Sequence, residues 1–303
     1  MGLQANSPGW HGVFPYLVTP SDKHGVINEA GLRDMITFVL DAGVHGITPL
    51  GSTGEMPFFT EDDRDRVIAV AVDEAAGRVP VVGGVGGFST ASTVRQAARA
   101  KNRGVDGLLV TLQAYTPLTD QQIVTFYTDV AKETDLPIVI YHHHKLCHVE
   151  LSLPVAYQLA QLDNVYYVKE SSGNLTFFNN APGLAEAGLH LFGATAVSPV
   201  VSMLLGAIGW MSGPACVFPR ESVLMYDLCR QGRFDDAVAL ERTINPALAA
   251  FRTYGPAPTT KALLRARGLD MGDTVAPATA TVPDADTIVK KALAQADALI
   301  AKL

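Results

Sequence analysis

Short apolar runs alternate with longer amphipathic segments along most of the chain. Near-continuous apolar runs, typical of strands covered on both faces, occupy residues 12–20, 44–50, 79–85, 107–112, 137–142, 165–170, 190–193 and 207–212. Helical periodicity fills the intervening residues 28–42, 61–75, 91–103, 120–134, 153–162 and, more briefly, 200–205. Thr119 and Gln122 have the spacing of a capping box at the start of one helix. Eight strands joined by helices predict parallel βαβ units that close into a (β/α)8 TIM barrel of the α/β class.

The pattern changes after residue 212, where helical periodicity continues without further strands. The segments 221–230, 234–251, 259–267 and 285–303 are typical of helices, and residues 277–283 (PATATVP) of an extended linker. We therefore predict a barrel catalytic domain over residues 10–220 and a C-terminal helical extension over residues 221–303.

Composition narrows the class of protein. With 48% hydrophobic and 17% charged residues among 303, disorder is excluded as the main state. A formal net charge of −7 argues against a nucleic-acid partner. Three cysteines cannot form a disulfide framework, and residues 1–12 lack the basic and apolar regions of a secretory leader, so we expect a cytoplasmic protein. The uncharged stretch 197–216 could span a bilayer by length, but Pro199 and Pro214 favour burial in the core, and no membrane partner is expected.

Polar residues follow two of the predicted strands at the end where barrel enzymes hold their chemistry. Lys169 ends the apolar strand 165–170, where burial would lower its pKa and supply the neutral amine that imine formation requires. The alternative is a lysine that extends into solvent at the strand end. Tyr141, near the end of strand 137–142, could act as a general acid or base, or simply fill the barrel mouth.

A glycine-rich loop, Gly51-Ser52-Thr53-Gly54-Glu55, follows the predicted strand 44–50. Two glycines allow backbone N–H groups to converge on an anion, and two hydroxyl groups add donors. The loop would suit a small carboxylate, although an ordinary turn has the same pattern.

These three features coincide with a family pattern. The segments GVHGITPLGSTGE (43–55), PIVIY (137–141) and VKESSGN (168–174) resemble the dihydrodipicolinate synthase / N-acetylneuraminate lyase family of class I, pyruvate-type aldolases. The resemblance continues through FPYLVTP (14–20), RVPVVGGVGGFSTASTV (78–94), GVDGLLVTL (104–112), LGAIGWMSGPACVFP (205–219) and PTTKALLRARGL (258–269). It covers residues 10–295 in order, which is more specific than any single motif.

The resemblance implies a mechanism and a set of site residues. Lys169 would form a Schiff base with pyruvate or another 2-keto acid, Tyr141 would shuttle protons, and Ser52 would join that relay. The implied substrate-binding residues are Gly51, Thr53, Tyr115, His143 and Gly193. The imine is itself the electron sink, so we expect no metal and no organic cofactor. The family's usual assembly implies a homotetramer built as a dimer of dimers, with a homodimer as the alternative.

Two positions depart from dihydrodipicolinate synthase. Leu146 stands five residues after Tyr141, where those enzymes have an arginine for the carboxylate of the aldehyde substrate. The tyrosine pair after the fourth strand is also missing, and Tyr115 stands one position late. The chain is therefore not expected to be a typical member. Apolar mouth residues favour an aldehyde without a carboxylate: Met56, Phe58, Phe59, Phe88 and Tyr115.

Three other interpretations stay open. The run His142-His143-His144, near Cys147 and His148, could bind a metal, but no carboxylate of the usual spacing joins it, and loop or substrate contacts are the alternative. The same lysine could serve a 2-keto-3-deoxy sugar acid dehydratase or a hydratase-aldolase. A non-catalytic binding barrel would be expected to have lost Lys169, Tyr141 or the GSTGE loop, and all three are present.

Overall fold

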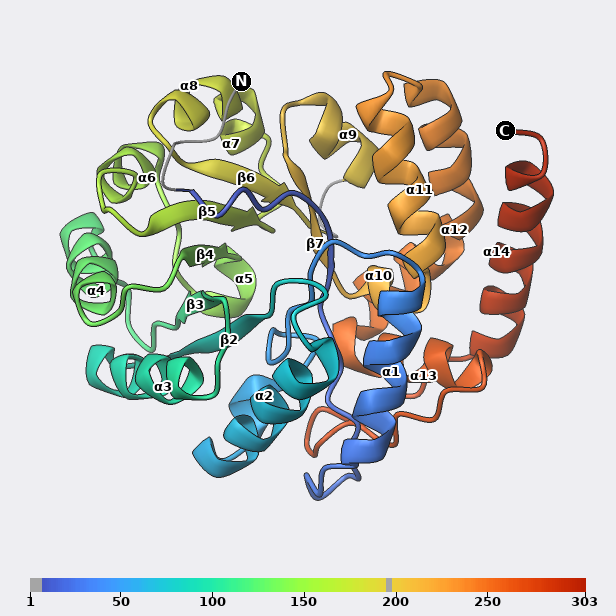
Figure 1. Ribbon diagram of the computed structural model, residues 1–303, viewed down its shortest axis with the longest axis horizontal. Coiled ribbons are helices and arrows are strands. Elements are labelled where there is room, and N and C mark those ends of the chain that lie inside the picture. Colours follow the sequence, from blue (N-terminus) through green and yellow to red (C-terminus); the bar gives the residue numbers. More distant parts are fainter. Residues whose placement is uncertain (1–6, 195–197) are drawn as a thin grey trace.

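Seven parallel strands form one curled sheet in the computed structural model, which describes residues 7–194 and 198–303 (Figure 1). The sheet order is β1-β7-β6-β5-β4-β3-β2. The strands are β1 (Gly12–Pro15), β2 (Val82–Gly87), β3 (Gly107–Leu112), β4 (Ile138–His142), β5 (Val165–Glu170), β6 (His190–Gly193) and β7 (Gly209–Ser212). With helices packed outside this sheet, the fold is the expected TIM barrel followed by C-terminal helices.

The prediction of a regular strand over residues 44–50 is wrong. Only isolated parallel bridges form there, between Thr48 and Tyr16 and between Ile47 and Val81. Pro49 has no N–H group to donate to a ladder, and Leu50 adopts a left-handed φ of 60° that ends the extended conformation. The segment nevertheless lies between β1 and β2 and closes the ring, because its backbone hydrogen bonds reach both neighbours.

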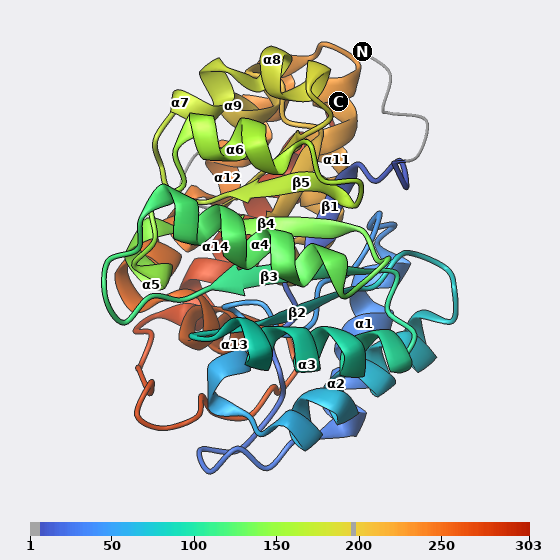
Figure 2. The same ribbon diagram turned by 90° about the vertical axis from the view of Figure 1, so that its left-hand side faces the viewer.

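Helices cover the outside of the barrel, as the amphipathic pattern predicts. Figure 2 shows α3, α4 and α6 in front of the strands. The barrel helices that the periodicity predicted are α1 (Glu29–Asp41), α2 (Glu61–Ala75), α3 (Thr90–Asn102), α4 (Asp120–Lys132), α6 (Leu153–Leu159) and α9 (Pro199–Leu204). The capping box of Thr119 and Gln122 is present at α4. The periodicity missed short elements of one or two turns: η1 (Met56–Phe58), α5 (His144–Cys147), α7 (Thr176–Asn179), α8 (Ala181–Glu186) and α10 (Pro214–Val217).

Four longer helices follow β7 and the short α10, and Figure 1 shows them at the right-hand side of the barrel. They are α11 (Pro219–Arg230), α12 (Phe234–Tyr254), α13 (Pro256–Ala266) and α14 (Ala285–Ile300). Residues 277–283 contain neither helix nor strand, in agreement with the predicted linker. The division between residues 220 and 221 stays a prediction, since α11 also packs against β1.

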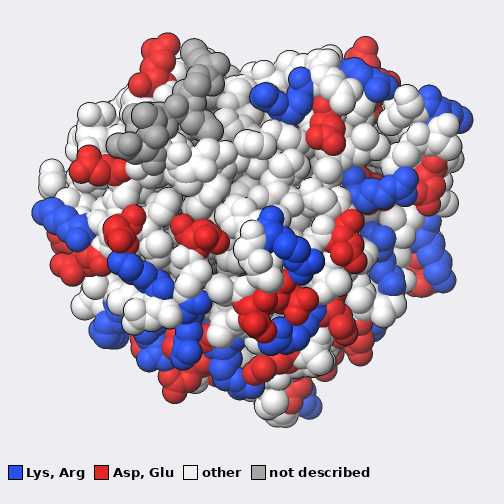
Figure 3. All heavy atoms as spheres, viewed as in Figure 1, with Lys and Arg blue, Asp and Glu red and all other residues white. Residues whose placement is uncertain are grey.

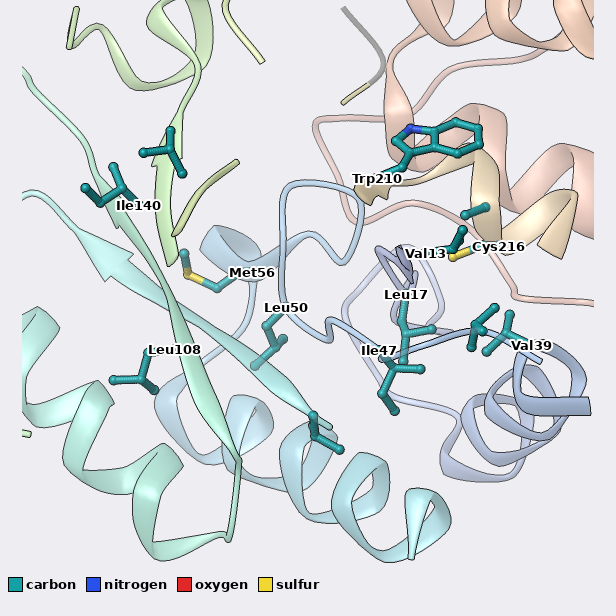
Figure 4. Packing of buried hydrophobic residues seen from close by; sticks show 14 of the residues in the cluster. Val13, Leu17, Val39, Ile47, Leu50, Met56, Leu108, Ile140, Trp210 and Cys216 are labelled. Atoms are coloured by element: carbon teal, nitrogen blue, oxygen red, sulfur yellow. The ribbon is translucent and has the colours of Figure 1, made fainter. Parts of the chain in front are cut away.

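Buried side chains form two clusters, one inside the barrel and one between the sheet and the helices. Trp10, Phe14, Tyr167, Phe192 and Met211 belong to the inner cluster. Figure 4 shows part of the outer cluster around the closing segment, including Leu17, Ile47 and Val39. A filled interior of this kind leaves space for a ligand only above the inner cluster, at the end of the strands.

Charged side chains gather over α1, α2 and α3 on the face shown in Figure 3. Acids and bases alternate there in interhelical ion pairs, such as Arg33–Asp73, Arg66–Glu29 and Arg99–Asp65. This mixture is unlike the one-sided basic surface that a nucleic acid requires. Within the described residues, the helices are too short or too polar for any of them to cross a membrane, while Val197 of the uncharged stretch lies outside those residues.

Candidate active site

The register of β4 and β5 places the two most reactive side chains at one level of the barrel. Tyr141 pairs with Lys169 along the sheet. Two residues earlier, Val139 and Tyr167 belong to the inner cluster, and strand alternation therefore turns Tyr141 and Lys169 inward as well. The Lys169 Nζ atom lies 4.3 Å from the centre of the Tyr141 ring and 4.6 Å from that of Tyr16.

Burial determines the protonation state of the Lys169 amine. The residue is 5% exposed, and its Nζ atom has no hydrogen-bond partner among the described residues. Loss of hydration lowers the pKa of Lys169 from its ordinary value to about 7, although the nearby Cys147 and Glu170 act in the opposite direction. Half of the amine groups would thus be neutral, and nucleophilic, close to pH 7.

The phenol of Tyr141 connects the lysine to the loop after the closing segment. Its hydroxyl donates a hydrogen bond of 3.1 Å to Ser52 Oγ. Burial raises the pKa of Tyr141 well above its usual range, so the group is a neutral hydroxyl that can pass a proton. The structure therefore brings Lys169, Tyr141 and Ser52 together.

Residues 51–55 form a tight turn after the closing segment, residues 44–50. Leu50 and Glu55 adopt left-handed φ angles of 60° and 57° on either side. A Cβ atom at Gly51 would lie only 2.6 Å from the Tyr16 ring. Only glycine therefore allows the backbone to approach this ring so closely. Among the described residues, no protein acceptor receives the backbone N–H of Ser52 or Thr53. These two donors are available to a carboxylate.

A buried ion pair fixes the far end of this loop. The Glu55 carboxylate lies 2.8 Å from Lys261 Nζ of α13 and also accepts a hydrogen bond of 2.8 Å from the Val275 N–H. Lys261 donates a further bond of 3.1 Å to Ser21 Oγ. Both partners of the ion pair are almost fully buried. The C-terminal part of the chain therefore holds the loop that contains Ser52 and Thr53.

A cavity of about 620 Å³, here called the lysine cavity, opens above these groups. Its walls come from the ends of several strands, the loop with Ser52 and Thr53, and the end of α12. The buried hydroxyl groups of Tyr16, Ser171 and Ser212 line it without a hydrogen-bond partner among the described residues. Unsatisfied buried hydroxyls are costly unless a ligand or water meets them, so the cavity suits a small polar substrate.

The other sequence-predicted residues are placed differently. His143 lines the lysine cavity, and burial together with the charge of Lys169 lowers its pKa to about 4, so it is a neutral polar contact. Gly193 ends β6 under Ser202 and is not among the lining residues. Tyr115 is 93% exposed and lines a separate surface groove with Phe88, so one chain by itself does not bring it to the lysine cavity.

The histidine run divides among different environments. His142 points away from the barrel interior, and its Nδ1 atom lies 2.6 Å from Glu170 Oε2 while Nε2 accepts from the Leu151 N–H. The other Glu170 oxygen accepts from the Ser172 N–H. Among the described residues no three histidine, cysteine, aspartate or glutamate side chains form a group that could hold a metal ion. His142 and Glu170 instead tie the loop after β5 to β4.

Several lining residues were absent from the sequence-based prediction. Tyr16 could have been found, because it follows the inward-facing Phe14 by two positions. Ser171 directly follows the strand that carries Lys169. No local signal identifies Phe251 and Arg252, because they reach the cavity only through the packing of α12 over the barrel mouth.

The fold is a TIM barrel whose mouth holds a buried lysine beside a tyrosine–serine hydrogen bond. The sequence model described as the Dihydrodipicolinate synthetase family matches residues 10–296. The chain belongs to this family, and it is a lyase of the class I aldolase type.

Individual relatives agree with this assignment. The chain is 35% identical to an uncharacterized DapA-like lyase of Halobacterium salinarum over 87% of this chain and 86% of that protein. It is 32% identical to the 4-hydroxy-tetrahydrodipicolinate synthase of Methanospirillum hungatei over 84% and 88%. The crystal structure of dihydrodipicolinate synthase from Aquifex aeolicus superimposes with a TM-score of 0.87 at 27% identity, covering 95% of this chain and 98% of that chain.

Proposed function

We propose that the protein is a Schiff-base-forming lyase that acts on pyruvate or another 2-keto acid, with reversible cleavage and formation of a C–C bond to an aldehyde lacking a carboxylate. The observation that carries this proposal is the Lys169 amine, which is buried and faces a cavity beside the Tyr141–Ser52 hydrogen bond. The carboxylate of the keto acid would bind the hydroxyl groups and free N–H donors of Ser52 and Thr53.

The chemistry follows from these positions. The neutral amine of Lys169 attacks the keto carbon, and loss of water leaves an imine that is protonated on nitrogen. During cleavage, Tyr141 accepts the proton of the 4-hydroxyl group while its own proton passes along the hydrogen bond to Ser52, whose hydroxyl proton passes to water in the cavity. The C3–C4 bond breaks at the same time, and its electron pair moves into the enamine. The aldehyde leaves, C3 takes up a proton, and water releases pyruvate from the lysine. The imine is the electron sink of this sequence, so the proposal assigns no cofactor.

The same lysine could instead serve a 2-keto-3-deoxy sugar acid dehydratase, which expels a hydroxyl group from the substrate, or a hydratase-aldolase, which adds water to a C=C bond before it cleaves the C–C bond. The unpartnered hydroxyl groups of Tyr16, Ser171 and Ser212 favour a polar substrate and keep this second candidate open. Product analysis distinguishes dehydration from cleavage, since only cleavage yields pyruvate, and an unsaturated 2-keto acid as substrate identifies a hydratase-aldolase.

Trapping tests the shared step directly. The protein is incubated with pyruvate, reduced with borohydride and digested for peptide mass spectrometry, with Lys169→Ala as the control. A reduced pyruvyl group on Lys169 is the expected result. If no adduct forms with pyruvate or with larger 2-keto acids, and Lys169→Ala behaves as the wild type does, the proposal is wrong.

The assembly that we propose is a homotetramer or a homodimer in the cytoplasm. Phe88 and Tyr115 support association, because they are 67% and 93% exposed and line one surface groove together. Light scattering after size-exclusion chromatography measures the mass, and substitution of Tyr115 by a charged residue should shift it toward the monomer.

A further inference from the structure

A second cavity, here called the side cavity, adjoins the lysine cavity and has a volume of about 480 Å³. Ser52, Tyr141 and Leu146 line both cavities. The hydroxyl group proposed to exchange a proton with the aldehyde oxygen therefore stands at the junction between them. A substrate held as an imine on Lys169 could extend past Tyr141 into this space.

The walls of the side cavity are mainly apolar. Met56, Pro57 and Phe58 of η1 form one side, and Tyr254 and Pro256 form another. Among the described residues, no lysine or arginine lines this cavity. A volume of about 150 Å³ is enough to hold a benzene ring in a protein interior, so the side cavity has room for a substituted ring or a branched chain.

The ionisable groups in these walls offer no charge to a substrate. Glu55 is already paired with Lys261 at 2.8 Å and receives the Val275 N–H. Burial raises the pKa of Cys147 to about 12, which keeps its thiol neutral. A carboxylate entering this space would lose its hydration and gain no cation, which is strongly unfavourable.

Cationic side chains line the lysine cavity instead. Lys145 and Arg252 line the lysine cavity and form no ion pair with another described residue. An aldehyde with a carboxylate could bind these two cations instead, at the mouth of the barrel and away from the side cavity. The two cavities thus predict opposite preferences for a charged substituent, and both Tyr141 and Leu146 line each of them.

We infer that the side cavity binds the apolar substituent of the aldehyde, and that the preferred aldehydes are uncharged aromatic or branched aliphatic compounds. This inference rests on the proposed function, because it assumes that the keto acid is bound as an imine on Lys169. Leu146 is the specificity-determining residue, since an uncharged side chain there leaves the junction without a partner for a carboxylate.

The test compares benzaldehyde with 4-carboxybenzaldehyde, which differ only in the carboxylate, each with pyruvate as the second substrate. Product is measured as the 4-hydroxy-2-keto acid, and kcat/KM is compared within each variant. The wild type should favour benzaldehyde by about tenfold or more. Leu146→Arg should reduce or reverse this ratio, whereas the matched variant Leu146→Met, similar in size and uncharged, should preserve it.

An equal or reversed ratio in the wild type overturns the inference. If Arg252→Gln or Lys145→Gln then removes a preference for the carboxylate, the acceptor binds at the mouth instead. Borohydride trapping with pyruvate alone is run on every variant. An adduct on Lys169 without a preference for benzaldehyde refutes the substrate class only, whereas absence of any adduct refutes the proposed function and the inference with it.

Discussion

Burial of Lys169 should make its reaction with pyruvate depend on pH around neutrality. The pKa falls from 10.5 to about 7 through loss of hydration. At pH 7 about half of the buried amines are neutral, and only about one in three thousand would be neutral in an unperturbed lysine. Burial therefore raises the concentration of the reactive form by about a thousandfold.

The assay is adduct formation over a short, fixed time at pH 5.5–9.5, followed by borohydride reduction and quantitative peptide mass spectrometry. Labelling of Lys169 should rise by about tenfold per pH unit below pH 7 and level off above it. Lys145 provides an internal control, because it lines the same cavity but is exposed to water. It should be labelled far more slowly at pH 7.

Two results would refute this reasoning. A midpoint for Lys169 above about pH 9 would mean that the site does not depress the pKa by burial. Equal labelling of Lys145 and Lys169 at pH 7 would mean that the cavity gives the buried amine no advantage. Lys169→Ala, which carries no amine at that position, measures the background of non-specific reduction.

Three further predictions concern the site and its support. Tyr141→Phe should retain the pyruvate adduct but lower aldol turnover by on the order of 10²- to 10⁴-fold, because the proton-carrying oxygen is lost; trapping and steady-state rates measured side by side check this. Lys169→Met should raise the free energy of unfolding at pH 7 by about 4 kcal/mol. Between about pH 7 and pH 10.5 the unfolded wild-type chain binds a proton at Lys169 that the folded chain does not bind. Wild-type stability therefore rises with pH, and the stability gained by Lys169→Met should shrink. Denaturant titrations at pH 7 and 9.5 that show the same difference between the two proteins would contradict this prediction. Lys261→Met should destabilise the fold by about 3–5 kcal/mol by leaving the buried Glu55 charge unpaired, and Glu55→Gln added to Lys261→Met should restore most of the loss; a double variant no more stable than Lys261→Met would disprove the pairing argument.

Part of the active site could be predicted from the strand pattern. The places of Tyr141 and Lys169 near the ends of two predicted strands were found from the sequence, and in the structure each stands two residues beyond a member of the inner cluster, Val139 or Tyr167. The helical periodicity likewise predicted the long barrel helices within a few residues of their ends. Short elements such as α5 were missed because four residues are too few to establish a period.

The closing segment shows where pattern and structure separate. Residues 44–50 have the composition of a buried strand, yet only Ile47 and Thr48 form ladder bridges. Apolar composition correctly indicates that this segment is buried. It does not indicate whether consecutive residues keep an extended backbone. Pro49 and the left-handed Leu50 end the extension and turn the chain toward Ser52.

The sequence by itself determined the barrel class, the position of Lys169 near the end of a strand and the small, polar character of the loop that contains Ser52. These features depend on residue periodicity and on the backbone freedom of nearby residues. The tertiary structure alone decided that Lys261 holds Glu55, that α12 brings Arg252 to the mouth, and that an apolar cavity adjoins Tyr141. Such contacts join segments that are distant along the chain, and their side chains meet only because the helices pack over the end of the barrel.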